Sequence, residues 1–67
     1  MSQPRYPDVV VQLSGQDGNA FAVMGAVTKA LRRAGVELVE RRKYMNEAMS
    51  GSYDELLATT AQWVTIK

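Results

Sequence analysis

Apolar and polar residues alternate near the start of the chain. Within residues 8–14 every second side chain is apolar, namely Val9, Val11 and Leu13, and the residues between them would face the other way. A period of two with several β-branched side chains is typical of a half-buried strand. The pattern predicts a strand over residues 8–14, preceded by a short lead-in at residues 1–7.

The spacing of apolar residues then changes to that of a helix. Within residues 20–34 the repeat positions are Ala20, Met24, Val27, Leu31 and Ala34. Spacings of three and four place them on one face of a helix directed at a core. Residues 15–18, Gly-Gln-Asp-Gly, predict a turn before this helix, with Asp17 or Asn19 as its cap, and Gly35 predicts its end.

Two further helices are expected in the second half of the chain. One spans residues 37–50, ends near Gly51, and carries an apolar side made of Leu38, Tyr44, Met45, Ala48 and Met49. Arg41 projects into that apolar arc. The other begins at Ser52, because Ser52 and Glu55 have the spacing of a capping box, in which each side chain bonds the backbone of the other residue.

The last predicted element is residues 63–66, Trp-Val-Thr-Ile, which favour a strand by β propensity. The expected order is therefore β-α-α-α-β, an α+β fold in which the two terminal strands pair as a ribbon with three helices packed on it. A two-stranded sheet is only marginally stable alone. We expect residues 8–67 to form one small domain.

Composition narrows the functions that this chain can have. It has 67 residues, eight Lys and Arg against seven Asp and Glu, and neither Cys nor His. The absence of Cys and His excludes disulfides, thiolate chemistry, the usual zinc sites and every His-dependent triad. We therefore expect no enzyme and no cofactor. No apolar run reaches the length of a membrane span and the start does not look like a secretory signal, so a cytoplasmic protein is expected.

Four segments together resemble a known family. They are residues 11–21 (VQLSGQDGNAF), 31–36 (LRRAGV), 50–57 (SGSYDELL) and Trp63-Val64. Read together, they are similar to a family of short uncharacterised proteins found in actinobacterial genomes, phages and plasmids. The resemblance covers residues 9–64 and implies a mobile-element or phage setting, with a host cytoplasm as the location, but no particular activity. Family members tend to be acidic in the second helix, whereas this chain has Arg41-Arg42-Lys43.

Positive charge gathers in one stretch of this nearly neutral chain. Residues 29–43 hold six Lys and Arg against two Glu, a local charge of +4. The candidate partner-binding residues are Arg32, Arg33, Arg41, Arg42 and Lys43. This stretch is either a solvated face, a surface that binds an acidic host protein, or a nucleic-acid contact. Arg41 itself is either buried in an ion pair with Glu37 or exposed to a partner.

A second candidate surface lies on the first helix. Phe21, Gly25 and Thr28 form a stripe offset from the apolar one. Phe21 either closes the core against the third helix, or the stripe is an interface for a second copy. Edge pairing of the ribbon is another route to a homodimer. The sequence thus favours a small non-enzymatic interaction module that binds a host protein or itself, with a nucleic-acid-binding accessory protein as the alternative.

Overall fold

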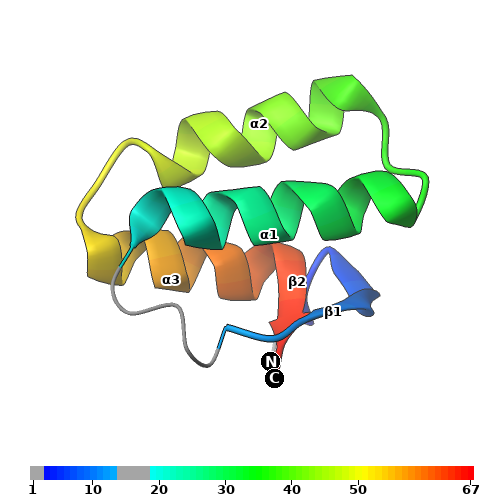
Figure 1. The fold of residues 1–67 in the computed structure, drawn as a ribbon, viewed down its shortest axis with the longest axis horizontal. Helices are drawn as coiled ribbons and strands as arrows, with labels where there is room; N and C mark the ends of the chain where they lie inside the picture. Colours follow the sequence, from blue (N-terminus) through cyan, green and yellow to red (C-terminus); the bar gives the residue numbers. More distant parts are fainter. Residues whose placement is uncertain (1–2, 14–18) are drawn as a thin grey trace.

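The chain folds in the predicted order of strands and helices. The computed structural model describes residues 3–13 and 19–67. Within them the elements are β1 (Tyr6–Val11), α1 (Ala20–Arg33), α2 (Leu38–Ala48), α3 (Tyr53–Trp63) and β2 (Val64–Ile66). The three helices run side by side, and α3 leads directly into β2 (Figure 1). The α+β class, with its β-α-α-α-β order, is therefore confirmed.

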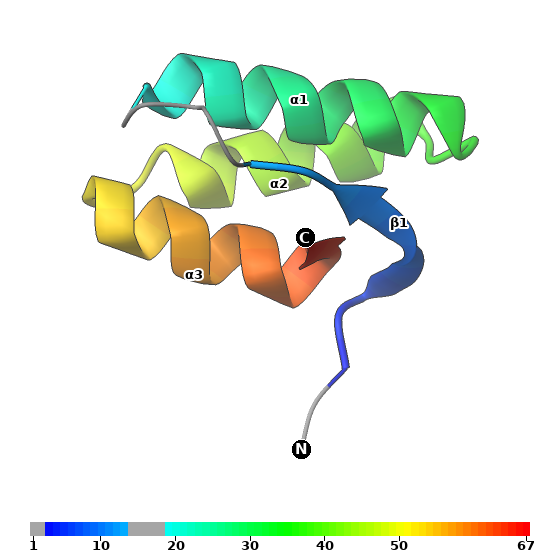
Figure 2. The same cartoon turned by 60° about the horizontal axis from the view of Figure 1, so that its bottom comes forward.

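The two strands pair in parallel. Tyr6 lies opposite Val64, Val10 opposite Thr65 and Val11 opposite Ile66, with an irregularity between Tyr6 and Val10. Parallel neighbours need a long crossover, and the three helices supply it. Figure 2 shows β1 passing beneath α1 toward the end of the chain. The predicted alternation is confirmed, because Val9 and Val11 are buried while Val10 is 53% exposed.

The first strand begins earlier and ends earlier than residues 8–14. It starts at Tyr6 because the Arg5 backbone N–H already donates to the Gln62 carbonyl over 2.9 Å, which extends the pairing toward α3. It ends at Val11, and Ser14 lies outside the described residues. The end of the lead-in is therefore part of the domain rather than a separate segment.

Local signals at the ends of α1 behave as the sequence indicates. The Asn19 side chain accepts the Ala22 backbone N–H over 3.2 Å and caps the helix. The alternative cap, Asp17, and the turn at residues 15–18 lie outside the described residues. At the other end Gly35 has φ 86°, and the Val36 N–H bonds the carbonyl four residues before Gly35 over 3.0 Å. This is a Schellman motif, which glycine forms at little steric cost.

The capping box at the start of α3 is also confirmed. The Glu55 N–H donates to Ser52 Oγ, and the Ser52 N–H donates to Glu55 Oε1, each over 3.3 Å. The preceding helix α2 ends at Ala48, two residues before the predicted end. A Cβ on Gly51 would lie 2.6 Å from Glu55 Oε2. Glycine at this position therefore leaves room for the capping box.

The core takes side chains from every element. Its buried apolar members are Val9, Val11, Val23, Met24, Val27, Leu31, Tyr44, Ala48, Leu56, Trp63 and Val64. The apolar side predicted for α2 is only partly right, because Leu38 and Met49 are exposed. At 3.6 residues per turn these two lie about 120° to 140° around the helix from Tyr44. The buried Tyr44 ring defines the face of α2 that packs on the core, so the Leu38 and Met49 side chains are directed to solvent.

Candidate functional site

Trp63 joins the start of the chain to its end. Its side chain is 3% exposed and lies at the last position of α3. The Tyr6 ring stacks on it with centroids 6.0 Å apart, and the Tyr44 ring meets it edge-on at 5.8 Å. The Arg5 guanidinium lies 4.8 Å from the indole centroid, within the range of a cation–π contact. Trp63 therefore fixes β1 against α2 and α3.

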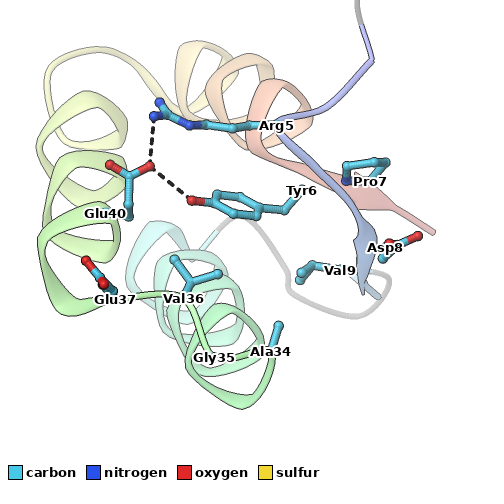
Figure 3. A pocket seen from close by; sticks show the side chains of 10 residues that line it. All are labelled: Arg5, Tyr6, Pro7, Asp8, Val9, Ala34, Gly35, Val36, Glu37 and Glu40. Carbon is cyan, nitrogen blue, oxygen red and sulfur yellow. Dashed lines mark hydrogen bonds and ion pairs between the residues drawn. The ribbon is translucent and has the colours of Figure 1, made fainter.

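Two glutamates of α2 complete this cluster. Glu40 Oε1 forms an ion pair with Arg5 over 2.8 Å and accepts the Tyr6 hydroxyl over 3.0 Å, as Figure 3 shows. Glu47 Oε1 accepts the Trp63 Nε1–H over 3.0 Å. We call these six residues, Arg5, Tyr6, Glu40, Tyr44, Glu47 and Trp63, the Trp63 cluster. One ion pair and two hydrogen bonds join its members to one another, so the cluster holds β1, α2 and α3 together.

Both tyrosines of the Trp63 cluster have a raised pKa. Burial raises the pKa of Tyr44, whose hydroxyl shares a 2.7 Å hydrogen bond with Thr60 Oγ1. Burial and the neighbouring Glu40 carboxylate raise the pKa of Tyr6. A phenol with a raised pKa is neutral at pH 7 and serves as a hydrogen-bond donor. These tyrosines therefore act as packing and hydrogen-bonding groups.

A hollow of about 530 Å³ opens beside the Trp63 cluster. Its walls are residues 5–9 on one side and the turn from α1 to α2, with Glu37 and Glu40, on the other (Figure 3). Within the described part of the chain, no three His, Cys, Asp or Glu side chains come together as metal ligands would. Nor does any helix among those residues combine the length and the apolar character needed to cross a membrane.

The predicted basic residues do not share one face. Arg32, Arg33, Arg42 and Lys43 are exposed. Arg33 lines a second hollow, beside β1, together with Lys29. Consecutive helical residues point about 100° apart, so Arg41, Arg42 and Lys43 spread over more than half the circumference of α2. The basic residues of α2 therefore point in different directions from one another. Binding of an acidic host protein by these residues, and the alternative of a nucleic-acid contact by residues 29–43, both stay predictions.

Arg41 does not form the ion pair with Glu37 that is one of its two expected roles. Its side chain is half-buried, and its Nε–H donates to the Val36 carbonyl over 3.2 Å. Among the described residues, the ion pair that forms joins Arg5 to Glu40, so the expected pair with Glu37 is wrong. Val36 follows the Schellman turn of Gly35. Arg41 therefore stabilises the connection between α1 and α2 by satisfying a carbonyl that no helix uses.

Replacing Arg41 should lower stability, whereas replacing its neighbour should not. Loss of a charge-assisted hydrogen bond predicts a fall of about 1 to 2 kcal/mol in the free energy of unfolding of Arg41→Ala. Arg42→Ala is the matched control and should stay within about 0.5 kcal/mol of the parent, because Arg42 is exposed. Urea denaturation followed by circular dichroism measures both. Equal losses in the two variants would contradict a structural role for Arg41.

An apolar surface is present on α1, where the sequence predicts the second candidate binding surface. Phe21 is 77% exposed, so the expectation that it closes the core against α3 is wrong. Met49, which is 60% exposed, lines the same hollow of about 280 Å³ between α1 and the turn before α3. Gly25 is exposed and Thr28 is half-buried, and both follow Phe21 along α1. We call Phe21, Gly25, Thr28 and Met49 the Phe21 face.

The Trp63 cluster is the feature that sequence reasoning missed. The sequence predicts Tyr44 on the apolar side of its helix and Trp63 at the start of the last strand, but it leaves Tyr6 in the lead-in. Tyr6 and Glu40 are separated by 34 positions in the chain. The one available signal is the presence of aromatic residues at both ends of a chain whose terminal strands pair.

Comparison of the chain with protein-family models, curated proteins and solved structures finds no match in any of the three. The resemblance to short actinobacterial, phage and plasmid proteins therefore stays a prediction. Function has to be argued from the surfaces that the fold itself presents.

Proposed function

We propose that this chain is a small protein-interaction module that binds a second copy of itself through the Phe21 face. One observation carries the proposal: Phe21 of α1 and Met49, which directly follows α2, are both exposed beside one hollow. Single exposed apolar side chains are common on proteins and need no explanation. Two large ones that converge on one hollow favour an interface.

Gly25 supports the same surface. It lies in the interior of α1, where glycine costs about 1 kcal/mol relative to alanine. A Cβ at this position would meet nothing within 4 Å, and its φ is not positive. Neither packing within the chain nor backbone conformation therefore requires glycine here. Its place one turn from Phe21 suits the close approach of a helix from outside.

The charge distribution favours a second copy over a charged partner. The first part of α1, residues 20–28, contains no charged side chain, so a copy of the same stripe meets no like charge. The net charge of +1 adds little repulsion between two molecules. A two-fold interface uses the same surface on both subunits, so it needs no further complementary site. An acidic or basic partner would gain no ion pair at residues 20–28.

Sedimentation equilibrium tests the proposal. At about 100 μM, a range in which weak dimers form by mass action, the parent chain should be largely dimeric and Phe21→Ser largely monomeric. Val39→Ser is the matched control, because Val39 is also exposed but lies at the start of α2, far along the antiparallel helix pair from Phe21. Its dimer should be unchanged. A monomeric parent chain, or a dimer that survives Phe21→Ser, would overturn the proposal.

A further inference from the structure

A second surface of α1 faces the free edge of β1. The hollow beside the Trp63 cluster and the hollow that Arg33 lines have volumes of about 530 and 550 Å³. They share Asp8, Val9 and Ala34, so the two hollows adjoin one another and together make up a groove between β1 and the C-terminal half of α1. We call it the β1 groove. Figure 3 shows its first half, with residues 5–9 facing the turn after α1.

The β1 groove follows the edge of the strand. Residues 8–12 all line its second half, although their side chains alternate between the two faces of the sheet. A hollow lined by side chains from both faces of the sheet must run along the edge of the strand. Among the described residues β1 pairs with β2 alone, so its other edge is unpaired.

The register shows which backbone groups point into the groove. Val11 accepts the Lys67 N–H over 2.9 Å and lies opposite Ile66, so its carbonyl points toward β2. Neighbouring residues of a strand direct their N–H and C=O groups to opposite edges. The N–H and C=O of Val10 therefore point away from β2, toward the groove. An extended chain laid there can bond to them as an added strand.

The opposite wall has room for such a chain. It is built from Ala26, Ala30 and Ala34, which recur every four residues and present only methyl groups. The same wall carries the exposed basic side chains of Lys29 and Arg33. Neither of them forms an ion pair with any described carboxylate. Small residues set the width of this half of the groove, and its two cations, Lys29 and Arg33, outnumber the one carboxylate that lines it, Asp8.

We infer that the β1 groove binds an extended peptide segment of another protein, which adds to the free edge of β1 and places an acidic side chain against Lys29 and Arg33. A second copy of β1 is a poorer occupant. It offers one carboxylate, Asp8, and brings a second Lys29 and Arg33 with it. The inference does not use the Phe21 face, so it goes beyond the proposed self-association.

Nuclear magnetic resonance titration tests the inference with defined probes. One short synthetic peptide alternates valine with glutamate, and its partner alternates valine with lysine. The glutamate peptide should shift the amide signals of residues 8–12 and 26–34, and should bind at least about tenfold more tightly than the lysine peptide, a difference of about 1.4 kcal/mol. Lys29→Glu combined with Arg33→Glu should reverse that preference.

Two control variants separate the possible failures. Arg42→Glu with Lys43→Glu makes the same change of charge on exposed residues that do not line the groove, and should keep the parent preference. Phe21→Ser should bind the glutamate peptide as the parent does, whatever its effect on dimers. The inference is overturned if the two peptides bind alike, if the shifts fall outside the groove, or if neither peptide binds at about 2 mM, where even weak complexes form.

Discussion

Replacing Trp63 with alanine is expected to remove a large share of the free energy of unfolding of the protein. The indole contacts Tyr6, Tyr44 and Arg5, and donates to Glu47, so its removal leaves a cavity between both ends of the chain and α2. Large aromatic-to-alanine changes in cores cost about 3 to 5 kcal/mol. A chain of 67 residues has a total stability of about 3 to 10 kcal/mol at the usual value per residue.

Urea denaturation followed by far-ultraviolet circular dichroism measures this effect without depending on tryptophan fluorescence. Trp63→Phe keeps an aromatic ring and should lose clearly less stability than Trp63→Ala. Val39→Ala is the surface control, because the Val39 side chain is 72% exposed, and should change stability by less than about 0.5 kcal/mol. If Trp63→Ala retained the parent's midpoint, the view that the Trp63 cluster holds β1 to the helices would be wrong.

The features that the sequence predicts correctly are those specified by neighbouring residues. Asn19, Gly35 and the pair Ser52 and Glu55 each act within one helical turn, so their types and spacing are enough to mark helix ends. The order of elements follows from the same local periodicities. Local signals do not specify which helix face lies against which neighbour, and this is why the exposed Leu38 and Met49 were expected to be buried.

The arrangement of the basic residues shows the same limit of local signals. Charge adjacent in sequence was taken as charge adjacent in space, although consecutive residues of a helix point about 100° apart. Arg41 turns to the Val36 carbonyl and Arg33 to the β1 groove. The four- and three-residue spacing of Phe21, Gly25 and Thr28 does place them on one side of α1, as helix geometry requires. The exposure of Phe21 required the tertiary structure.

The two proposed binding surfaces lie on opposite flanks of α1. Phe21 and Ala30 lie about 180° apart around the helix axis, with the buried Val27 on the face between them. A second copy at the Phe21 face and a peptide in the β1 groove therefore approach from different directions. If both proposals hold, a dimer would display two peptide grooves, and binding at one surface would leave the other accessible.

Replacing Tyr6 tests whether the start of the chain belongs to the folded domain. Tyr6→Ala removes the ring stacked on Trp63 and the hydrogen bond to Glu40. Loss of a half-buried aromatic side chain predicts a fall of about 2 to 3 kcal/mol in the free energy of unfolding, somewhat less than for a fully buried ring. Tyr6→Phe keeps the ring and should cost only about 1 kcal/mol, the net value of a typical hydrogen bond.

The pH dependence of the Tyr6→Phe difference gives a second readout. The pKa of Tyr6 is raised above its usual value of 10.0 in the folded chain, so the native state binds this proton more tightly than the unfolded state does. The stabilisation from Tyr6 is therefore complete below pH 10 and is lost as the pH rises through the higher native pKa. Tyr44 has the same direction of pKa shift but is present in both proteins, so its effect cancels.

Urea denaturation at neutral and strongly alkaline pH should show that the stability advantage of the parent over Tyr6→Phe shrinks at high pH. A constant difference, or equal stability of Tyr6→Ala and the parent at neutral pH, would mean that Tyr6 is not held against Glu40 and Trp63 in solution.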